Sequence, residues 1–299
     1  MSSLFLVRYG ELALKSPPVR REFERSLRRN IVEQFVREGL AVRLRSDRGH
    51  LYAEADDPDA AVRILRRVFG VTSVSRVFEV ATDRDAIRDR LLESADPRLL
   101  PNSSFAVRAR RTGSHPFTSQ ELARDLGSDV MARFGDRGLR VDLGHPDVEL
   151  FVEVRGPRTY LYFDRASGPG GLPLGVAGRL VALIDGPRGA LGAYLMMKRG
   201  CRVGLVTVPG GEPLAREVLV RFDPTVRIST SDPDPPAVTK ALGGLADTLQ
   251  ADGVVLPIGV DDYPSAREAW GDRVLFSPTV GLSDEEVATR WKNVTALAS

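Results

Sequence analysis

A glycine- and proline-rich segment, residues 167–178, divides the chain into two parts with different patterns. Glycine and proline occupy seven of its twelve positions, so it cannot hold a regular helix or strand. It marks either a domain boundary or a loop whose backbone contacts a ligand. With 299 residues, the chain is long enough for two or three domains of ordinary size.

The residues after this segment predict alternating strands and helices. Three continuous apolar runs are typical of strands buried on both faces of a parallel sheet: Leu180–Ile184, Val203–Val208 and Val254–Ile258. Helical patterns separate or follow these runs at residues 189–199, 235–251 and 284–299. The alternation predicts an α/β doubly wound parallel-sheet domain, with any ligand at the carboxyl edge of its strands.

The residues before the segment predict an α+β half made of two small units. The first has the β-α-β-β-α-β pattern of a ferredoxin-like unit, with strands at residues 4–8, 41–45, 51–55 and 74–80. Its first helix, residues 19–38, carries apolar side chains at four-residue steps on one face: Phe23, Leu27, Ile31 and Phe35. The second unit combines helices at residues 83–92 and 119–134 with strands at residues 104–110, 148–155 and 160–165.

Positive charge is concentrated in the first 180 residues. They hold 30 basic and 25 acidic side chains, whereas the remainder holds 12 basic and 15 acidic ones. Of the 42 basic residues, 38 are arginine, whose guanidinium group suits bidentate phosphate contacts and stacking on bases. The asymmetry favours an acidic partner for the N-terminal half.

The stretch Arg108–Phe117 is the most informative local feature. Strand alternation puts Arg108 and Arg110 on one face, and the following loop adds basic, hydroxyl and aromatic groups. Such a set suits contact with phosphates and unpaired bases, and the helix that opens at Thr118 and Ser119 can meet a phosphate at its N-terminus. A solvated arginine face with a helix cap at Ser119 fits equally well, so the residues alone leave both interpretations open.

Other classes of protein find no support in the sequence. The single cysteine, Cys201, excludes an intrachain disulfide, and the three histidines form no helical pair, so no metal site is expected. No stretch reaches the roughly 20 apolar residues of a membrane span. The first residues read as a strand rather than a signal peptide, so we expect a cytoplasmic protein with no membrane partner.

Three stretches, in register along the chain, resemble the tRNA 4-thiouridine sulfurtransferases, the ThiI-like family. Residues 8–15 (RYGELALK) resemble its opening RYGEIxLKG, residues 105–123 its THUMP core, and residues 168–175 (GPGGLPLG) its GPGGLPVG. The resemblance implies a ferredoxin-like domain at residues 1–75 and a THUMP RNA-binding domain at residues 76–166. A linker, residues 167–180, then precedes a pyrophosphatase-like (PP-loop) domain at residues 181–299.

The resemblance also implies a partner, tRNA, docked mainly along its acceptor-stem region by the first two domains. Together with the charge pattern it indicates the following RNA-contacting residues: Arg8, Lys15, Arg20, Arg21, Arg28, Arg108, Arg110, Arg111, Thr112, His115, Phe117, Thr118 and Ser119. An interdomain loop is expected at Gly168, Gly170, Gly171 and Gly175.

The nucleotide loop departs from the family pattern. Where the family has SGGxDS, whose backbone amides cradle nucleotide phosphates, this chain has IDGPRG at residues 184–189. Pro187 removes a backbone N–H, and Asp185 brings negative charge to the place of a phosphate. If ATP with Mg still binds, the expected contacts are Ala182, Leu183, Gly186, Arg188, Thr207, Val208 and Gly259.

The sequence therefore predicts a tRNA-binding accessory protein or pseudo-enzyme of tRNA thio-modification, without its own adenylation activity. Its α/β domain would serve folding or a homodimer, and a separate catalytic or sulfur-donor protein would supply the chemistry, because the family's sulfur-carrying cysteines have no counterpart. The alternative is an active ATP-dependent tRNA sulfurtransferase with an altered loop and an external sulfur donor. A third hypothesis gives residues 168–175 and 186–189 to another small-molecule or anion ligand.

Overall fold

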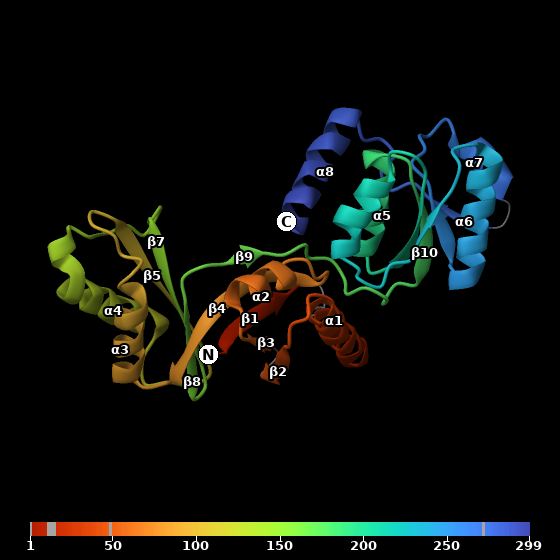
Figure 1. Cartoon of the computed structure of the whole chain (residues 1–299). Helices are drawn as coiled ribbons and strands as arrows, with labels where there is room; N and C mark the ends of the chain where they lie inside the picture. The colour runs from red at the N-terminus through yellow and green to blue at the C-terminus, as the bar shows by residue number, and fades with distance from the viewer. Residues whose placement is uncertain (1, 11–15, 48–49, 271–272) are drawn as a thin grey trace. The chain divides into compact units, whose positions relative to one another are not determined.

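The computed structural model describes residues 2–10, 16–47, 50–270 and 273–299 (Figure 1). The chain forms two compact units. Unit 1 comprises Met1–Leu6, Arg45–Pro58 and Ser75–Ala166, and unit 2 comprises Val7–Leu44, Asp59–Val74 and Ser167–Ser299. The helices of the ferredoxin-like segment therefore belong to unit 2, whereas most residues of its strands belong to unit 1.

A nine-stranded sheet runs through unit 1 in the order β2-β3-β1-β4-β8-β7-β5-β6, with β9 paired to β4. The strands are β1 (Ser3–Tyr9), β2 (Arg43–Asp47), β3 (His50–Ala55), β4 (Val71–Ala81), β5 (Ser104–Thr112), β6 (Arg140–Val141), β7 (Val148–Arg155), β8 (Arg158–Tyr162) and β9 (Ala166–Ser167). Strand β5 pairs parallel with β6 and β7, and β7 pairs antiparallel with β8.

Helices α3 (Arg84–Ala95) and α4 (Ser119–Phe134) cover one face of this sheet (Figure 1). Leu122, Leu126 and Val130 of α4 are buried at four-residue steps, in one core with Phe105 and Leu150 of the strands. This spacing places all three side chains on one side of a helix. The predicted α+β architecture of the N-terminal half is confirmed.

Unit 2 contains a five-stranded, all-parallel sheet in the order β12-β11-β10-β13-β14. Its strands are β10 (Arg179–Ile184), β11 (Arg202–Thr207), β12 (Ile228–Thr230), β13 (Gly253–Val255) and β14 (Val274–Phe276). The helices of this domain are α5 (Pro187–Lys198), α6 (Pro235–Leu249), α7 (Tyr263–Trp270) and α8 (Asp284–Ala298). Two short helical turns, Leu214–Val218 and Leu219–Arg221, follow β11.

Strand β10 shows why the predicted double winding is correct. Its Leu180 and Ala182 lie in the core formed with α5 and α8, whereas Val181 lies in the core formed with α6. Helices therefore cover both faces of the sheet (Figure 1). A strand buried on both faces must be apolar at every position, which is the pattern of Leu180–Ile184.

Helices α1 (Pro17–Arg37) and α2 (Pro58–Leu65) also pack in unit 2. Leu27, Ile31 and Phe35 of α1 have no exposed surface, which confirms the predicted apolar face. No helix among the described residues is long and apolar enough to cross a membrane.

The sequence analysis missed elements between residues 208 and 280. Helix α7 and strands β12 and β14 were not predicted, and β13 ends at Val255 rather than Ile258. Pro264 is the second residue of α7. The first turn of a helix tolerates proline because its N–H groups have no partner within the helix.

Candidate functional site

The end of β5 carries most of the predicted RNA-contacting residues of unit 1. Strand pairing sets Arg108 beside Phe151 and Arg110 beside Glu153, so the Cβ atoms of both arginines lie on the sheet face opposite α3 and α4. Strand β6 pairs with β5 only at Ser104 and Phe105, so the long side chain of Arg108 reaches Leu143 along the edge of β5. Arg110, Arg111 and Thr112 are exposed. Among the described residues, neither Arg110 nor Arg111 forms an ion pair with a carboxylate, and Arg111 Nη1 donates to the Gly113 carbonyl at 3.0 Å.

Arg108 is held more firmly than its neighbours. Its Nε donates to Glu149 Oε1 at 2.9 Å, and its Nη2 donates to the Leu143 carbonyl at 2.8 Å. His115 contacts the Thr112 carbonyl through Nε2 at 3.1 Å. These bonds fix the strand end and the start of the loop.

The ring of Phe117, which the sequence analysis assigned to RNA contact, is buried inside unit 1. Its side chain is only 5% exposed and belongs to the core of unit 1 with Leu122. Burial of an aromatic ring against apolar side chains is more favourable than its exposure on a loop. The imidazole of His115, which stacks on Phe117 with ring centroids 5.7 Å apart, is the ring that remains partly open to solvent.

Thr118, rather than Ser119, caps helix α4. The Glu121 N–H donates to Thr118 Oγ1 at 3.1 Å, and the Thr118 N–H donates to Glu121 Oε2 at 2.7 Å. These reciprocal bonds form a capping box. The backbone N–H of Thr118 also holds the pKa of the Glu121 carboxyl below its ordinary value. The predicted phosphate contact at this helix N-terminus therefore has to compete with a carboxylate.

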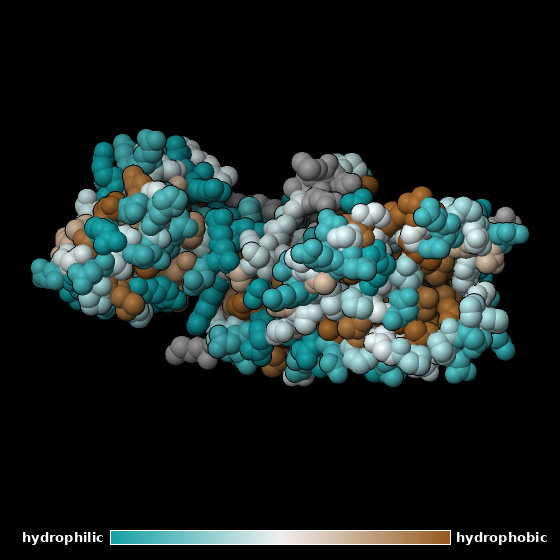
Figure 2. Space-filling model, turned by 90° about the horizontal axis from the view of Figure 1, so that it is seen from above, coloured by the Kyte–Doolittle hydropathy of each residue, from teal (hydrophilic) through white to brown (hydrophobic). Residues whose placement is uncertain are grey.

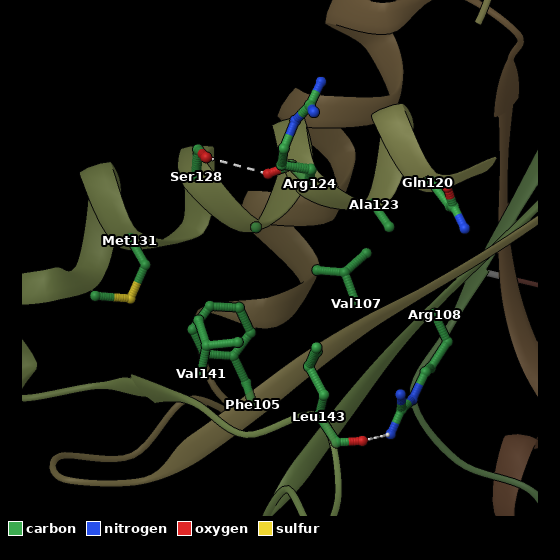
Figure 3. Close-up of a pocket in the computed structure, with 11 residues that line it drawn as sticks. Phe105, Val107, Arg108, Gln120, Ala123, Arg124, Ser128, Met131, Val141 and Leu143 are labelled. Carbon is green, nitrogen blue, oxygen red and sulfur yellow. Dashed lines mark hydrogen bonds between the residues drawn. The ribbon is translucent and has the colours of Figure 1, made fainter. Parts of the chain in front are cut away.

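A groove that the sequence analysis did not predict lies between α4 and the strands β5 and β6 (Figure 3). Its volume is about 710 Å³, and its lining is mostly apolar. The lining residues are Phe105, Val107, Arg108, Gln120, Ala123, Arg124, Gly127, Ser128, Met131, Val141 and Leu143. Arg108 and Gln120 lie toward the same end of the groove (Figure 3). Val141 and Leu143 expose 54% and 66% of their surface, an unusual degree for apolar side chains on a short connection.

The other predicted basic contacts lie in unit 2, except Lys15, which lies outside the described residues. Arg20 Nε donates to Glu24 Oε1 at 3.0 Å, and Arg28 Nη2 donates to the Leu44 carbonyl at 2.9 Å. Arg21 is exposed, whereas Arg8 is half-buried. The arginines of α1 therefore differ in how firmly they are held: Arg20 and Arg28 bind groups of the protein, whereas Arg21 is exposed.

The predicted nucleotide loop connects β10 to α5, at the carboxyl edge of the sheet. Pro187 is the first residue of α5, where its missing N–H costs no helical hydrogen bond. Arg188 Nη1 donates to the Thr279 carbonyl at 3.0 Å. Its Nη2 donates to the Leu282 carbonyl at 2.9 Å and to Asp284 Oδ1 at 2.7 Å. The Arg188 guanidinium, which could have offset the negative charge of Asp185, is thus hydrogen-bonded to other groups of the protein.

Two glycines in and near this loop, Gly189 and Gly211, pack closely against backbone carbonyl oxygens. A Cβ atom on Gly189 would lie 2.3 Å from the Leu183 carbonyl oxygen, and one on Gly211 would lie 1.8 Å from the Ile184 carbonyl oxygen. Burial raises the pKa of the Asp185 carboxyl, and nearby Arg188 opposes that shift. A phosphate cradle needs free N–H groups beside open space; here Pro187 supplies no N–H, and Gly189 and Gly211 pack against carbonyl oxygens.

Most of the remaining predicted nucleotide contacts lie on the neighbouring strands β10 and β11, where Leu183 pairs with Val206 and Ile184 with Thr207. Ala182 and Thr207 are buried in their strands, and Leu183 and Val208 are half-buried. The Gly259 N–H donates to Asp262 Oδ2 at 3.3 Å. Only Gly186 has open space at its Cβ position.

The segment after β9 packs within unit 2. The N–H groups of Gly168 and Gly170 donate to the carbonyls of Thr72 and Val71 at 3.0 and 2.8 Å, and that of Gly175 to Gly200 at 2.8 Å. At Gly171, with φ of +74°, a Cβ atom would lie 2.1 Å from the Lys198 carbonyl oxygen. The glycines permit close backbone contact within the protein, and nothing in their geometry requires a ligand.

Comparison with protein families gives two matches. The ThiI ferredoxin-like domain matches residues 4–75, and the THUMP domain matches residues 81–164. The Methanothermobacter thermautotrophicus protein named "Probable tRNA sulfurtransferase" is 41% identical over 206 residues, 67% of this chain and 51% of that protein. The protein of the same name from Methanosarcina mazei is 37% identical over 223 residues, 72% of this chain and 55% of that protein. The chain thus spans about half the length of the curated relatives it matches.

Two solved structures resemble the whole chain. The PH1313 protein of Pyrococcus horikoshii has a TM-score of 0.81 and 26% identity, covering 98% of this chain and 99% of that one. A 4-thiouridine synthetase, solved in complex with RNA and bound ATP, has a TM-score of 0.79 and 22% identity, covering 100% of this chain and 86% of that one. At this level of identity the second likeness establishes the fold alone.

Proposed function

Since this chain belongs to the tRNA sulfurtransferase family, we propose that it binds tRNA through its ferredoxin-like and THUMP domains. The observation that carries this proposal is the exposed end of β5, where Arg110 and Arg111 have no carboxylate partner among the described residues. A structural arginine is normally satisfied within the protein, as Arg188 is. Two exposed guanidinium groups without a carboxylate partner, beside an exposed threonine, suit an RNA phosphate backbone.

The groove beside α4 is the site that we assign to unpaired bases of the tRNA acceptor end. Single-stranded ends are recognised by stacking and by hydrogen bonds to base edges. The apolar walls offer the first kind of contact, and the amide of Gln120 at the groove's end offers the second. Helix α1 adds phosphate contacts through its exposed arginines, such as Arg21.

We further propose that the chain does not adenylate tRNA by itself. The contacts of Arg188, the proline at the start of α5 and the closed inner side of the loop support this. In this hypothesis the protein acts as an accessory or pseudo-enzyme of tRNA thio-modification, and a separate protein supplies the catalysis and the sulfur.

The alternative function is an active ATP-dependent tRNA sulfurtransferase with an external sulfur donor. It is favoured by the name of the curated relatives, "Probable tRNA sulfurtransferase". The two functions differ in one property, ATP binding.

Filter binding with tRNA at several salt concentrations tests the main proposal. We expect salt-dependent binding, and we expect the double variant Arg110→Ala/Arg111→Ala to bind about tenfold more weakly with a log–log salt slope lower by about 1.5. The matched control is Arg88→Ala/Arg90→Ala on α3, which removes the same charge from ion-paired arginines of unit 1. Binding without salt dependence, or equal losses in the two double variants, would sink the proposal.

The groove has its own test at Gly127, which lines it and has no atom within 4 Å of its Cβ position. Gly127→Leu fills the groove without a clash. We expect it to weaken binding of tRNA that has an unpaired 3′ end about tenfold, because it displaces at least one stacked base. Gly127→Ala, which leaves most of the groove open, is the control. Equal effects of Gly127→Leu on tRNA with and without the unpaired end would remove the groove from the interface.

A further inference from the structure

Helix α1 is bound to the α/β domain along one side. Gln34 is 2% exposed, and its Nε2 donates to the carbonyls of Arg221 and Phe222 at 2.9 and 2.8 Å. Asn30 is 4% exposed, and its Nδ2 donates to the Leu174 carbonyl at 3.2 Å. Buried amide side chains are stable only when their hydrogen bonds are made, so these two residues require this partner surface.

Arg202, at the start of β11, is the centre of the contact. Its Nη2 donates to Glu33 Oε2 of α1 at 2.7 Å, and its Nη1 donates to Asp223 Oδ1 at 3.0 Å. Asp223 is 1% exposed, so its charge depends on this guanidinium. Thr225 Oγ1 also accepts from Arg202. The Arg202 side chain thereby links α1 and β11 to residues 223–225, which follow the short helical turn Leu219–Arg221.

An aromatic cluster reinforces the contact. Phe69, which follows α2, packs against Tyr194 of α5 and Phe222, with ring centroids 5.3 and 5.5 Å apart. Arg67 is buried and donates to Glu38 Oε1 at 3.2 Å and to the Ser299 carbonyl at 3.1 Å.

The rest of α1 is basic. The helix holds six arginines and three glutamates, and Arg21, Arg25 and Arg29 are exposed. A helix whose polar side is fixed by buried hydrogen bonds presents its other side in one position. Such preorganisation lowers the ordering cost of binding.

We infer that the α/β domain acts as a support that fixes α1 for tRNA, with Arg202 as the positioning residue. This inference rests on the proposed function, and it assigns a role to a domain whose nucleotide loop is altered. The Arg202 guanidinium is engaged by Glu33, Asp223 and Thr225 of the protein itself, so in this inference its effect on RNA runs through α1.

A double-mutant cycle on the full chain tests the inference. Arg202→Met is measured in the wild-type background and in the background Arg21→Ala/Arg25→Ala, which removes exposed arginines of α1. In the wild-type background we expect tRNA affinity to fall about fivefold to tenfold. In the second background we expect a fall of less than about twofold, since the contacts that Arg202 positions are already gone. Equal losses in both backgrounds, or no loss in the first, would overturn the inference.

Two further variants keep the test interpretable. Arg216→Met removes an exposed arginine of the same domain, paired with Glu212 at 2.6 Å, and we expect no change in tRNA affinity. Gln34→Met replaces Arg202→Met if that variant does not fold, with the same expected pattern. Failure of the wild-type protein to bind tRNA contradicts the proposed function, whereas wild-type binding with an inert Arg202→Met contradicts only the positioning role.

Discussion

The β5–α4 and β10–α5 connections share one plan, a strand that leads through a short loop into a helix, with arginines at the strand end or in the first turn of the helix. The arginines of the two connections have opposite surroundings. At the end of β5, Arg110 and Arg111 are exposed and α4 is capped by Thr118. At the end of β10, Arg188 is bound to two carbonyls and a carboxylate of the same domain. The comparison teaches that the bonding partners of an arginine, rather than its position beside a strand–helix connection, decide whether its guanidinium can receive an anion.

The surfaces around the two connections differ as well. A groove of about 710 Å³ borders the first, whereas the carbonyl oxygens of Leu183 and Ile184 close against Gly189 and Gly211 at the second. Apolar residues are exposed in patches between hydrophilic ones over the molecule's surface (Figure 2). Apolar exposure is thus not confined to the groove, and what distinguishes the groove is its volume together with Arg108 and Gln120 at one end.

Charge reversal gives the largest expected contrast between the two connections. Arg110→Glu/Arg111→Glu should lower tRNA affinity about 100-fold, or about 2.7 kcal/mol, because two attractions become repulsions. Arg188→Glu should leave tRNA affinity within about twofold, since its partners lie within the protein. Gel-shift titrations at one salt concentration measure the tRNA affinity of both variants. Similar losses of affinity in the two variants would contradict the proposed difference between the β5–α4 and β10–α5 connections.

Removal of Arg188 should act on stability instead. Arg188→Ala deletes three hydrogen bonds and leaves two carbonyls without this donor, so we expect the free energy of unfolding to fall by about 2 kcal/mol. The ion pair to Asp284 contributes little of this, because that carboxylate is 99% exposed. Urea unfolding measures the loss. An unchanged midpoint would show that the loop does not depend on Arg188.

Removal of the α4 cap should have a smaller effect. Thr118→Ala removes the acceptor of the Glu121 N–H and should lower the free energy of unfolding by about 1 kcal/mol. Thr118→Ser keeps the hydroxyl group and should restore most of the loss. If alanine and serine variants unfold at the same denaturant concentration, the capping box contributes no stability.

The carboxyl of Asp185 gives the smallest prediction, one of pH dependence. Burial raises the pKa of this group above the unfolded value of 3.8. A raised folded-state pKa contributes stability below the unfolded pKa and loses it as the pH rises through the folded pKa. Asp185→Asn should therefore gain stability relative to the wild type between pH 3 and pH 7. A stability difference that stays constant over this range would contradict the raised pKa.

Local patterns predicted the helices of the first half well. Helix α4 begins and ends at the predicted residues 119 and 134, because its apolar spacing and its cap are encoded within residues 118–134. Helix α1 likewise buries the predicted Leu27, Ile31 and Phe35. Such elements need no knowledge of distant partners.

The site was harder to predict because its contacts are long-range. Arg188 is bound to residues 91 to 96 positions away, so no window of sequence shows that it is engaged. Phe117 looks like a loop aromatic until the core of unit 1 is assembled around it. The groove depends on Val141 and Leu143 facing α4, and their apolar character on a short connection was the only signal available.

A calorimetric titration of ATP with Mg into the tRNA-bound protein tests most directly whether the β10–α5 connection, unlike the β5–α4 connection, fails to bind its ligand. A first injection series with tRNA alone establishes that the recognition domains are active, and Arg188→Asp serves as the comparison variant because it restores the family's aspartate. For the wild-type protein we expect a saturable heat signal on titration with tRNA. With ATP we expect only the heat of dilution up to about 1 mM. A Kd of about 1 mM would correspond to a binding free energy of about −4.1 kcal/mol. Saturable ATP binding by the wild-type protein would contradict a closed β10–α5 loop and favour the active sulfurtransferase.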